Sequence, residues 1–443
     1  MIKKGSLTGL LLFGMFFGAG NLIFPPQLGL ESGQNFWPAI GGFVLSGVGI
    51  AILTLIIGTL NPKGYIDEIS KKIAPWFAVV YLVALYLAIG PFFAIPRTAT
   101  TAFSVGIEPM LPAGSHAIWL FGFTLVYFAL AYLIALNPSK ILDSIGRYLT
   151  PIFALLIVVL VVLGAAKYGS TAPQGATGEY AASAFGAGFL QGYNTLDALA
   201  SVAFSVVAVT TLNQLGFKNK KEYISTIWVV GILVALGFSV LYIGLAFLGN
   251  HFPLNLANLP KGVNVGASVL SSSTQAIFGP MAQIFLAIMV TVTCFTTTAG
   301  LIVSTGEFFH NTFPKVSYKV YAIVFTLVGF AIANLGLNAI IQYSVPALEI
   351  LYPITITIVM IVMVNRFLPL SKPGMQLTIA VVTLIAFASI LGRQFQLTAI
   401  LNLVNALPFA QASLPWLLPA LVGILLSLLL PNKQKSEAFE FEA

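Results

Sequence analysis

Two apolar stretches of the sequence are interrupted by residues that disfavour a helix. The first is GMFFGAGNLIFPP, at residues 14–26. Inside a helix, a glycine costs about 1 kcal/mol relative to alanine and a proline about 3 kcal/mol, so this segment predicts a broken helix. A break leaves amides and carbonyls without helical partners, and these can bind an anion and a small cation, respectively. Helix packing through a G-x-x-x-G pair explains Gly14 and Gly18, but it does not explain Gly20-Asn21 followed by Pro25-Pro26.

The second interruption lies in FLQGYNTLDALASVAF, at residues 189–204. The residues that interrupt it are Gly192, Tyr193, Asn194, Thr195 and Asp197. An ionised side chain in the middle of a membrane costs at least about 2.5 kcal/mol, so Asp197 requires a water-filled cavity, a cation or a hydrogen-bond donor. Two compatible roles stay open for it, which are a functional role and capping of the following half-helix.

Small and hydroxyl-bearing residues mark one face of TVTCFTTTAGLIVSTGEF, at residues 291–308. Their three- and four-residue spacing is typical of one face of a helix, and they are Thr293, Thr296, Thr297, Gly300 and Ser304. Neutral hydroxyl oxygens are hard ligands that suit Na⁺. Threonine also commonly bonds its own helix or a neighbouring helix in membranes, and both interpretations stay open.

Two residues of opposite charge are expected near the outer membrane surface. Arg97 lies in GPFFAIPRTATTAF, which Pro91 and Pro96 bend, and Glu349 lies in VPALEILYP. Charges within a membrane are usually paired, which favours an Arg97–Glu349 contact. The alternative is that Arg97 alone extends to the interface.

The composition places all of these segments in a membrane. Of the 443 residues, 58% are hydrophobic and 7% are charged, against about 25% charged in soluble domains. We therefore expect one integral membrane domain, residues 1–443, without nucleic-acid binding, because the basic residues that give the net charge of +7 are scattered over short loops. The lone Cys294 and three distant histidines favour no metal site, and no nucleophile–base pair or phosphate motif suggests an enzyme.

The fold class predicted from these stretches is an all-α membrane protein with twelve transmembrane helices. The predicted spans are 6–30, 36–60, 75–106, 117–136, 148–166, 183–214, 224–248, 277–306, 319–337, 346–366, 375–391 and 412–430. Basic residues concentrate on the cytoplasmic side of membrane proteins. With both termini in the cytoplasm, the 20 lysines and arginines all lie inside except Arg97, Lys167, Lys261 and Arg393.

The two breaks fall in spans one and six. Because the sixth span is five positions after the first, an odd number, the second unit runs in the opposite sense, as in an inverted 5+5 repeat with its site at the repeat interface. Repeat one then covers about residues 6–166 and repeat two about 183–366. Two further helices occupy about 375–430, and a polar tail covers 431–443.

Three stretches together resemble one family. GAGNLIFPPQLG, GPFFAIPRTAT and GYNTLDALAS are similar to the branched-chain amino acid:cation symporters of bacteria, and the resemblance extends over about residues 5–430. It implies the leucine-transporter-like fold and import of leucine, isoleucine and valine across the inner membrane with Na⁺ or H⁺. It also implies a multi-pass protein without an obligate protein partner, surrounded by the lipid bilayer.

The resemblance implies site residues as well. Amides of the first-span motif, here Gly18, Ala19 and Gly20 with Asn21, would bind the substrate carboxylate. A coupling Na⁺ would lie between first-span carbonyls near Gly14 and Phe17 and hydroxyls of the eighth span, in the register Thr296 and Thr297 or the register Thr297 and Thr298. Phe24 stands where the distant leucine transporter has its gate arginine, so Arg97 with Glu349 becomes the candidate outer gate.

The sequence thus predicts a secondary active transporter that imports branched-chain amino acids by symport with a cation, Na⁺ in the first instance. The substrate site would combine the first break with Gly192, Tyr193, Asn194 and Thr195. The alternatives are an H⁺-coupled transporter of other apolar amino acids, with Asp197 as the proton carrier, and a channel. Broken helices in two inverted halves argue against a channel, which would favour repeated filter residues around a symmetric pore.

Overall fold

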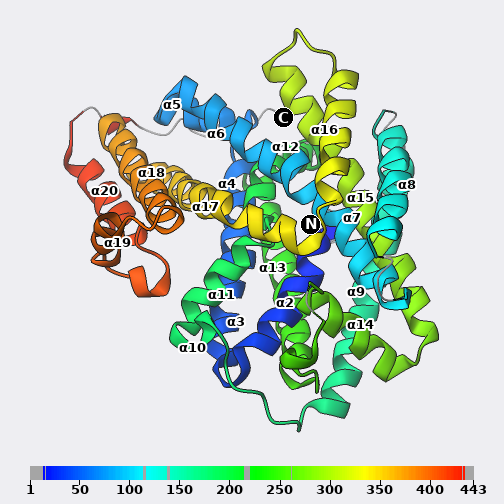
Figure 1. Cartoon of the computed structure of the whole chain (residues 1–443). Coiled ribbons are helices and arrows are strands. Elements are labelled where there is room, and N and C mark those ends of the chain that lie inside the picture. Colours follow the sequence, from blue (N-terminus) through cyan, green and yellow to red (C-terminus); the bar gives the residue numbers. More distant parts are fainter. Residues whose placement is uncertain are drawn as a thin grey trace.

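The protein is almost entirely helical in the computed structural model, which describes residues 13–14, 16–112, 116–136, 140–213, 220–260, 262–431 and 433–434 (Figure 1). The helices are α2 (Ala19–Ser32), α3 (Phe36–Val44), α4 (Ala51–Thr59), α5 (Gly64–Lys72), α6 (Pro75–Leu87), α7 (Ala94–Ala102), α8 (His116–Leu136), α9 (Lys140–Tyr168), α10 (Glu179–Ala182), α11 (Ala184–Tyr193), α12 (Asp197–Asn213), α13 (Lys220–His251), α14 (Val265–Phe278), α15 (Met281–Thr312), α16 (Tyr318–Ala333), α17 (Leu337–Phe367), α18 (Lys372–Gln394), α19 (Thr398–Asn405) and α20 (Leu417–Leu429). Two short strands, β1 (Leu370–Ser371) and β2 (Lys433–Gln434), pair antiparallel.

Seven helical stretches of the described chain are long and apolar enough to cross a membrane. The first of them, Ala19–Thr59, covers the second half of predicted span 6–30 and nearly all of span 36–60. The chain reverses between these spans at Gly33, whose φ is +47°. A Cβ at this position would lie 2.2 Å from the carbonyl oxygen of Gln174, so the close turn requires glycine.

Every predicted span coincides with one or more described helical segments, although residues 6–12 and 15 of span 6–30 lie outside the described residues. The crossing of the membrane by all twelve, and the inverted repeat, stay predictions. The α15–α16 turn and α5 lie at the top of Figure 1, whereas α10 and the loop before it lie at the bottom. Predicted inner and outer segments therefore occupy opposite ends of the molecule.

Both predicted helix breaks are confirmed, with a correction to each. Phe17 and Gly18 are non-helical, and α2 starts directly after them. Gly20, Asn21, Pro25 and Pro26, which we expected to contribute to the break, lie inside α2 instead. Proline is tolerated there because neighbouring helices of a membrane protein can satisfy the carbonyls that it frees. Of the residues expected to interrupt the second stretch, Gly192 and Tyr193 lie in α11 and Asp197 starts α12. The second break separates α11 from α12 at Asn194–Leu196, and Leu196 has a φ of +65°. Such backbone strain often marks a functional site.

The third predicted span is also irregular. Two π-helical segments, Ala88–Phe92 and Phe103–Ile107, flank α7. Gly90 is non-helical, directly before Pro91, as expected for a proline-induced bend. Pro96 lies within the first turn of α7, where proline fits. The bend places α7, which carries Arg97, against α2 and α15.

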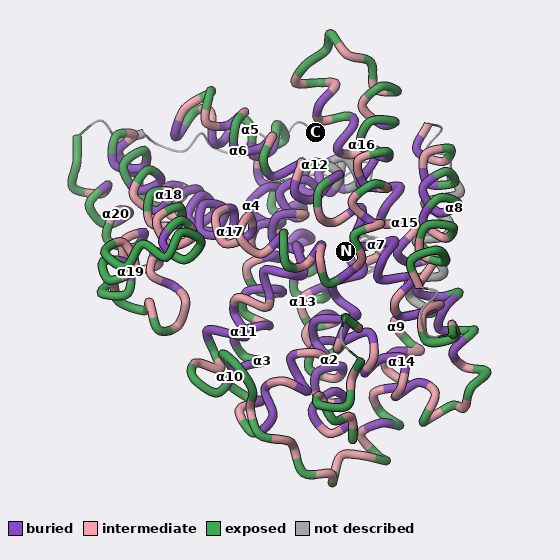
Figure 2. Tube along the Cα trace, viewed as in Figure 1, coloured by how far each residue is buried: buried purple, intermediate pink, exposed green. Residues whose placement is uncertain are grey.

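Burial is highest in the centre of the molecule. In Figure 2, buried residues follow α2, α4 and α12, whereas exposed residues dominate α8, α19 and α20. Many exposed side chains are large and apolar, among them Ile118, Leu384 and Leu429. An apolar exterior around a polar-lined centre is expected of a protein whose outer surface faces lipid.

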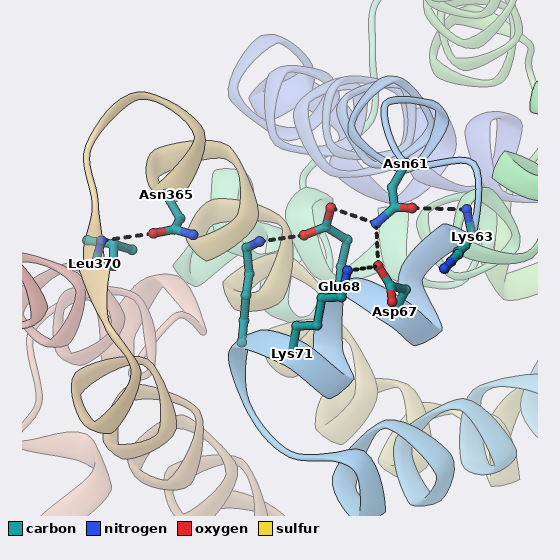
Figure 3. Close-up of polar contacts among 8 residues, drawn as sticks. Asn61, Lys63, Asp67, Glu68, Lys71, Asn365 and Leu370 are labelled. Carbon is teal, nitrogen blue, oxygen red and sulfur yellow. Dashed lines mark hydrogen bonds and ion pairs between the residues drawn. The ribbon is translucent and has the colours of Figure 1, made fainter. Parts of the chain in front are cut away.

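A polar cluster fixes α5 at one end of the molecule (Figure 3). Asn61 donates hydrogen bonds to Asp67 and Glu68, at 3.1 and 2.9 Å, and Lys72 forms a buried ion pair of 2.7 Å with Glu68. Partial burial alone would raise the pKa of Asp67, but hydrogen bonds from Asn61 and Lys71 outweigh it and lower this pKa below its usual value. The cluster holds α5 to the end of α4.

Two further segments outside the central helices form regular structure. The segment GASVLSSSTQAI, which follows the loop after α13, lies in α14. Of the polar tail, Lys433 and Gln434 pair with β1. The rest of the tail, from residue 435, lies outside the described residues.

Candidate functional site

The two helix breaks lie directly against each other. A Cβ at Gly20 would be 3.1 Å from the Cα of Thr195 and 3.3 Å from the carbonyl oxygen of Asn194. Only a residue without a side chain lets the start of α2 approach this backbone so closely. The sequence predicted both breaks, and the structure brings them together, although they are about 175 residues apart along the chain.

The start of α2 is organised by its own third residue. The Gly18 amide donates to Oδ1 of Asn21 at 3.1 Å. The next amides, in the first turn of α2, have no intrahelical partners because no helical residues precede them. These amides and the positive end of the helix dipole favour an anionic group. Asn21, predicted as a substrate ligand, thus has a structural role that the sequence did not indicate.

Asp197 is joined to α2 and α13 by hydrogen bonds. Nδ2 of Asn21 lies 3.1 Å from Oδ2 and 3.3 Å from Oδ1 of Asp197, and the Tyr242 hydroxyl donates to Oδ2 at 2.6 Å. Asn21 and Tyr242 also contact each other. These bonds reach other helices, so the carboxylate does more than cap α12. Tyr242 was missed at sequence level, where the only signal was a phenol inside an apolar run that needs a partner when buried.

Arg97 is the largest fully buried side chain of the described protein, with 1% of its surface exposed. It donates to the carbonyl oxygen of Asn194, at the end of α11, and to the Ser344 hydroxyl of α17 at 2.9 Å. Its guanidinium carbon lies 5.4 Å from the centre of the Phe24 ring, within the range of a cation–π contact. Its Nε has no hydrogen-bond partner among the described residues.

The expected contact between Arg97 and Glu349 is therefore not formed in this structure. Glu349 pairs with Arg393 instead, and one of their contacts, from Nη1 to Oε1, measures 3.3 Å. The reason is that the two side chains lie at different depths in the molecule. Arg97 is directed into the protein between the two breaks, whereas Glu349 lines a separate hollow with Arg393.

A small cavity of about 50 Å³ lies between the two breaks. Its polar lining comes from the starts of α2 and α12, from Arg97 and from Thr297. Its apolar lining includes Ile89, Ala94, Ala200, Phe204 and Leu301. One buried water needs about 10–15 Å³ of such space, and small-molecule sites usually measure about 300–1,000 Å³. The cavity is therefore too small for an amino acid and must widen to admit one.

A larger hollow of about 480 Å³, which we call the vestibule, adjoins the second break. It is lined by Glu31, Thr177, Gly178, Glu179, Tyr180, Ala187, Leu190, Gln191, Tyr193, Asn194, Val345, Leu348, Glu349 and Arg393. Asn194 lines the vestibule, while its carbonyl is held by Arg97 from the cavity side. Tyr193 stacks on Tyr352 with ring centres 4.1 Å apart. The second break thus forms part of the wall between the vestibule and the cavity.

The residues proposed for a cation are only partly brought together. Thr297 lines the cavity, and its methyl carbon would lie 3.5 Å from a Cβ at Gly18. Thr298 is directed elsewhere, because its hydroxyl bonds those of Thr98 and Tyr127. The hydroxyl of Thr296 bonds the carbonyl of Thr293 at 2.9 Å. Thr297 belongs to both expected registers and lies next to the first break. Because Thr298 is directed elsewhere, the geometry favours the register Thr296 and Thr297.

The remaining predicted residues can be placed in the same way. Gly14 lies in the helical turn before the first break, and Phe17 is fully buried in the break itself. Gly192 lies in the last turn of α11 and Thr195 in the second break, and the Thr195 hydroxyl donates to the Gly192 carbonyl at 2.8 Å. Among the described residues, no group of three or more histidine, cysteine, aspartate or glutamate side chains could hold a metal ion.

Two solved structures share this fold. The inward-facing conformation of Mhp1 aligns with a TM-score of 0.57 over 96% of this chain and 89% of its own, at 14% identity. MhsT in complex with L-phenylalanine aligns with a TM-score of 0.58 over 95% of this chain and 97% of its own, at 17% identity. The chain therefore has the leucine-transporter-like fold, in which two broken helices meet at a central cavity.

Sequence similarity then identifies the family. Residues 1–434 match the family described as branched-chain amino acid transport protein. A provisionally named branched-chain amino acid carrier of Staphylococcus haemolyticus is 40% identical over 96% of both chains. A similarly named carrier of Staphylococcus aureus is 39% identical over the full length of both. The chain belongs to the branched-chain amino acid transport protein family. It is a transporter and not an enzyme, and the resemblance noted in its sequence is confirmed.

Proposed function

We propose that this protein imports leucine, isoleucine and valine across the bacterial plasma membrane by symport with Na⁺. The observation that carries the proposal is the contact between the two helix breaks at one small, partly polar cavity. Discontinuous helices that meet at a central site are typical of secondary transporters. The family match supports branched-chain amino acids, and the L-phenylalanine bound in MhsT supports an amino acid as ligand for this fold.

The substrate would bind with its charged head at the breaks and its side chain toward the apolar lining. Amides of Ala19 and Gly20 favour the carboxylate, since they lie at the positive end of α2. Backbone groups of the second break, from Gly192 to Thr195, would complete the head-group site. A purely apolar pocket separates side chains that differ by one methylene only about 10- to 200-fold, so all three substrates are expected to compete.

Na⁺ would bind between the carbonyls near Gly14 and Phe17 and the hydroxyls of Thr296 and Thr297. The position of Thr297 beside Gly18 supports this proposal. The alternative is coupling to H⁺ with Asp197 as carrier, which is supported by the burial of this carboxylate at the second break. Cation and substrate would be coupled if each stabilises the form that binds the other.

Alternating access would connect the cavity to each side in turn, with both termini in the cytoplasm. Opening toward the vestibule would require the wall at Tyr193 and Asn194 to move. Arg97, which holds the Asn194 carbonyl, would have to release or follow it. Glu349 and Arg393 would act at the vestibule side of this wall.

The test is uptake of radiolabelled leucine by proteoliposomes under imposed Na⁺ and pH gradients, applied separately. Accumulation against the leucine gradient that depends on the Na⁺ gradient is the expected result. Accumulation driven by the pH gradient alone would replace Na⁺ with H⁺. Uptake that stops at equal concentrations under every gradient would indicate a channel or a facilitator and contradict symport.

A further inference from the structure

Two buried side chains of opposite charge line the central cavity without pairing with each other. Asp197 is 6% exposed and Arg97 is 1% exposed. The hydrogen bonds of Asp197 come from the neutral side chains of Asn21 and Tyr242. Those of Arg97 go to a backbone carbonyl and the Ser344 hydroxyl. Neither residue is in an ion pair within the described part of the chain.

Each of these two buried charges therefore lacks an oppositely charged partner among the described residues. Burial of a charge is costly unless it is paired and hydrogen-bonded, and in membrane proteins such charges usually pair with each other. Both groups also keep capacity to bind a ligand. A guanidinium has five N–H donors, and two of its three nitrogens have partners here while Nε has none. On Asp197, Oδ1 accepts one of the three hydrogen bonds described above, and Oδ2 accepts the other two.

A zwitterion supplies both missing charges at once. We propose that Asp197 binds the α-ammonium group and Arg97 the α-carboxylate of the transported substrate, so that these two residues select free α-amino acids. The inference rests on the proposed function and specifies how its substrate class is recognised. The start of α2 supports the assignment, because it lines the same cavity and the N-terminus of a helix favours a carboxylate. Asp197 lies in the first turn of α12, whose dipole favours an ionised carboxylate.

The two residues line the same cavity and are held there by different neighbours. Arg97 lies over the ring of Phe24, on α2, and so stands beside the helix whose amides attract the carboxylate. Asp197 lies at the second break and is fixed by two side chains from different helices. Because these two donors hold the carboxylate of Asp197 in one orientation, less conformational entropy is lost when it binds the ammonium group.

The test compares leucine with two analogues that each lack one charge. Leucinol keeps the ammonium group and lacks the carboxylate, whereas 2-hydroxy-4-methylpentanoate keeps the carboxylate and lacks the ammonium. Competition against radiolabelled leucine is measured on purified full-length protein. Loss of one partner of a buried charge pair typically weakens binding by about 30-fold or more, so both analogues should bind the unmodified protein at least that much more weakly than leucine.

Variants then assign each charge to its residue. In Asp197→Asn, leucine should weaken about 30-fold or more, while the hydroxy acid binds as before or more tightly. In Arg97→Gln, leucine should weaken similarly, while leucinol does not. Asp197→Glu and Arg97→Lys keep the charges and should keep the preference for leucine over both analogues. Glu108→Gln and Lys167→Gln remove charges outside the cavity and serve as controls.

Several results would overturn the inference. Equal binding of leucine and both analogues to the unmodified protein would do so without any variant. Unchanged leucine affinity in Asp197→Asn with an altered Na⁺ or pH dependence would make Asp197 an ion carrier and leave the proposed function intact. Equal weakening of all three ligands would assign the residues a purely structural role. Failure of the unmodified protein to bind leucine at all would instead contradict the proposed function.

Discussion

Substitution of Gly20 tests whether contact between the two breaks builds the site. An alanine Cβ at this position would lie 3.1 Å from the Thr195 Cα and 3.3 Å from the Asn194 carbonyl oxygen. Both neighbours are backbone atoms, so one of the breaks must shift by a few tenths of an ångström. Overpacking of this kind typically costs about 1–3 kcal/mol, and the gain of alanine over glycine in a helix offsets about 1 kcal/mol at most.

Gly41 provides a matched control. It also lies in a helix, α3, but a Cβ there would have no atom within 4 Å. Gly41→Ala should therefore be neutral or stabilising by up to about 1 kcal/mol. Relative to this control, Gly20→Ala should lower the free energy of unfolding by about 1–3 kcal/mol. If the same shift displaces the amides of α2, the affinity for leucine should fall about 5- to 150-fold.

The assay combines thermal unfolding of the purified protein with equilibrium binding of radiolabelled leucine. Gly20→Val adds two further carbons at the contact and should abolish binding while the protein still inserts into the membrane. If Gly20→Ala and Gly20→Val bind leucine as tightly as Gly41→Ala, then the approach of the two breaks does not position the substrate, and the reasoning from this contact is refuted.

Three further predictions concern the ion, the substrates and the buried ion pair. Thr297→Ala removes one neutral ligand and should raise the Na⁺ concentration for half-maximal leucine binding about 2- to 12-fold; Na⁺-independent binding in the unmodified protein would exclude the Na⁺ site. Isoleucine and valine should displace leucine with affinities within about 200-fold of it, which competition binding measures, and displacement by only one of them would contradict an apolar side-chain pocket. Lys72→Met leaves Glu68 buried without its ion-pair partner and should destabilise the protein by about 3 kcal/mol. Lys71→Met changes a side chain that is 46% exposed and should cost about 0–1 kcal/mol of stability. Equal unfolding temperatures of the two variants would contradict this difference.

The sequence by itself determined the class of protein and the positions of its breaks. Low charge and long apolar stretches leave a chain few options besides membrane helices, because only helices satisfy every backbone group within one segment. Gly18 to Asn21 and Gly192 to Asp197 were found for the same reason, since helix-breaking residues act on their own backbone and need no distant partner. The motifs around both breaks also indicated the family, because each motif is a run of consecutive residues.

Only the tertiary structure decided which side chains meet. Shared depth and opposite charge predicted Arg97 next to Glu349, yet Arg97 contacts Asn194 and Ser344, while Glu349 pairs with Arg393. The charge of a side chain limits the depth at which it can lie in the membrane. Its contact partner depends instead on which helices pack together and on the direction of each side chain. Tyr242, which binds Asp197 from a third helix, could not be selected among other buried tyrosines for the same reason. Helix packing sums many small contacts across the whole chain, and such contacts leave no local pattern in the sequence.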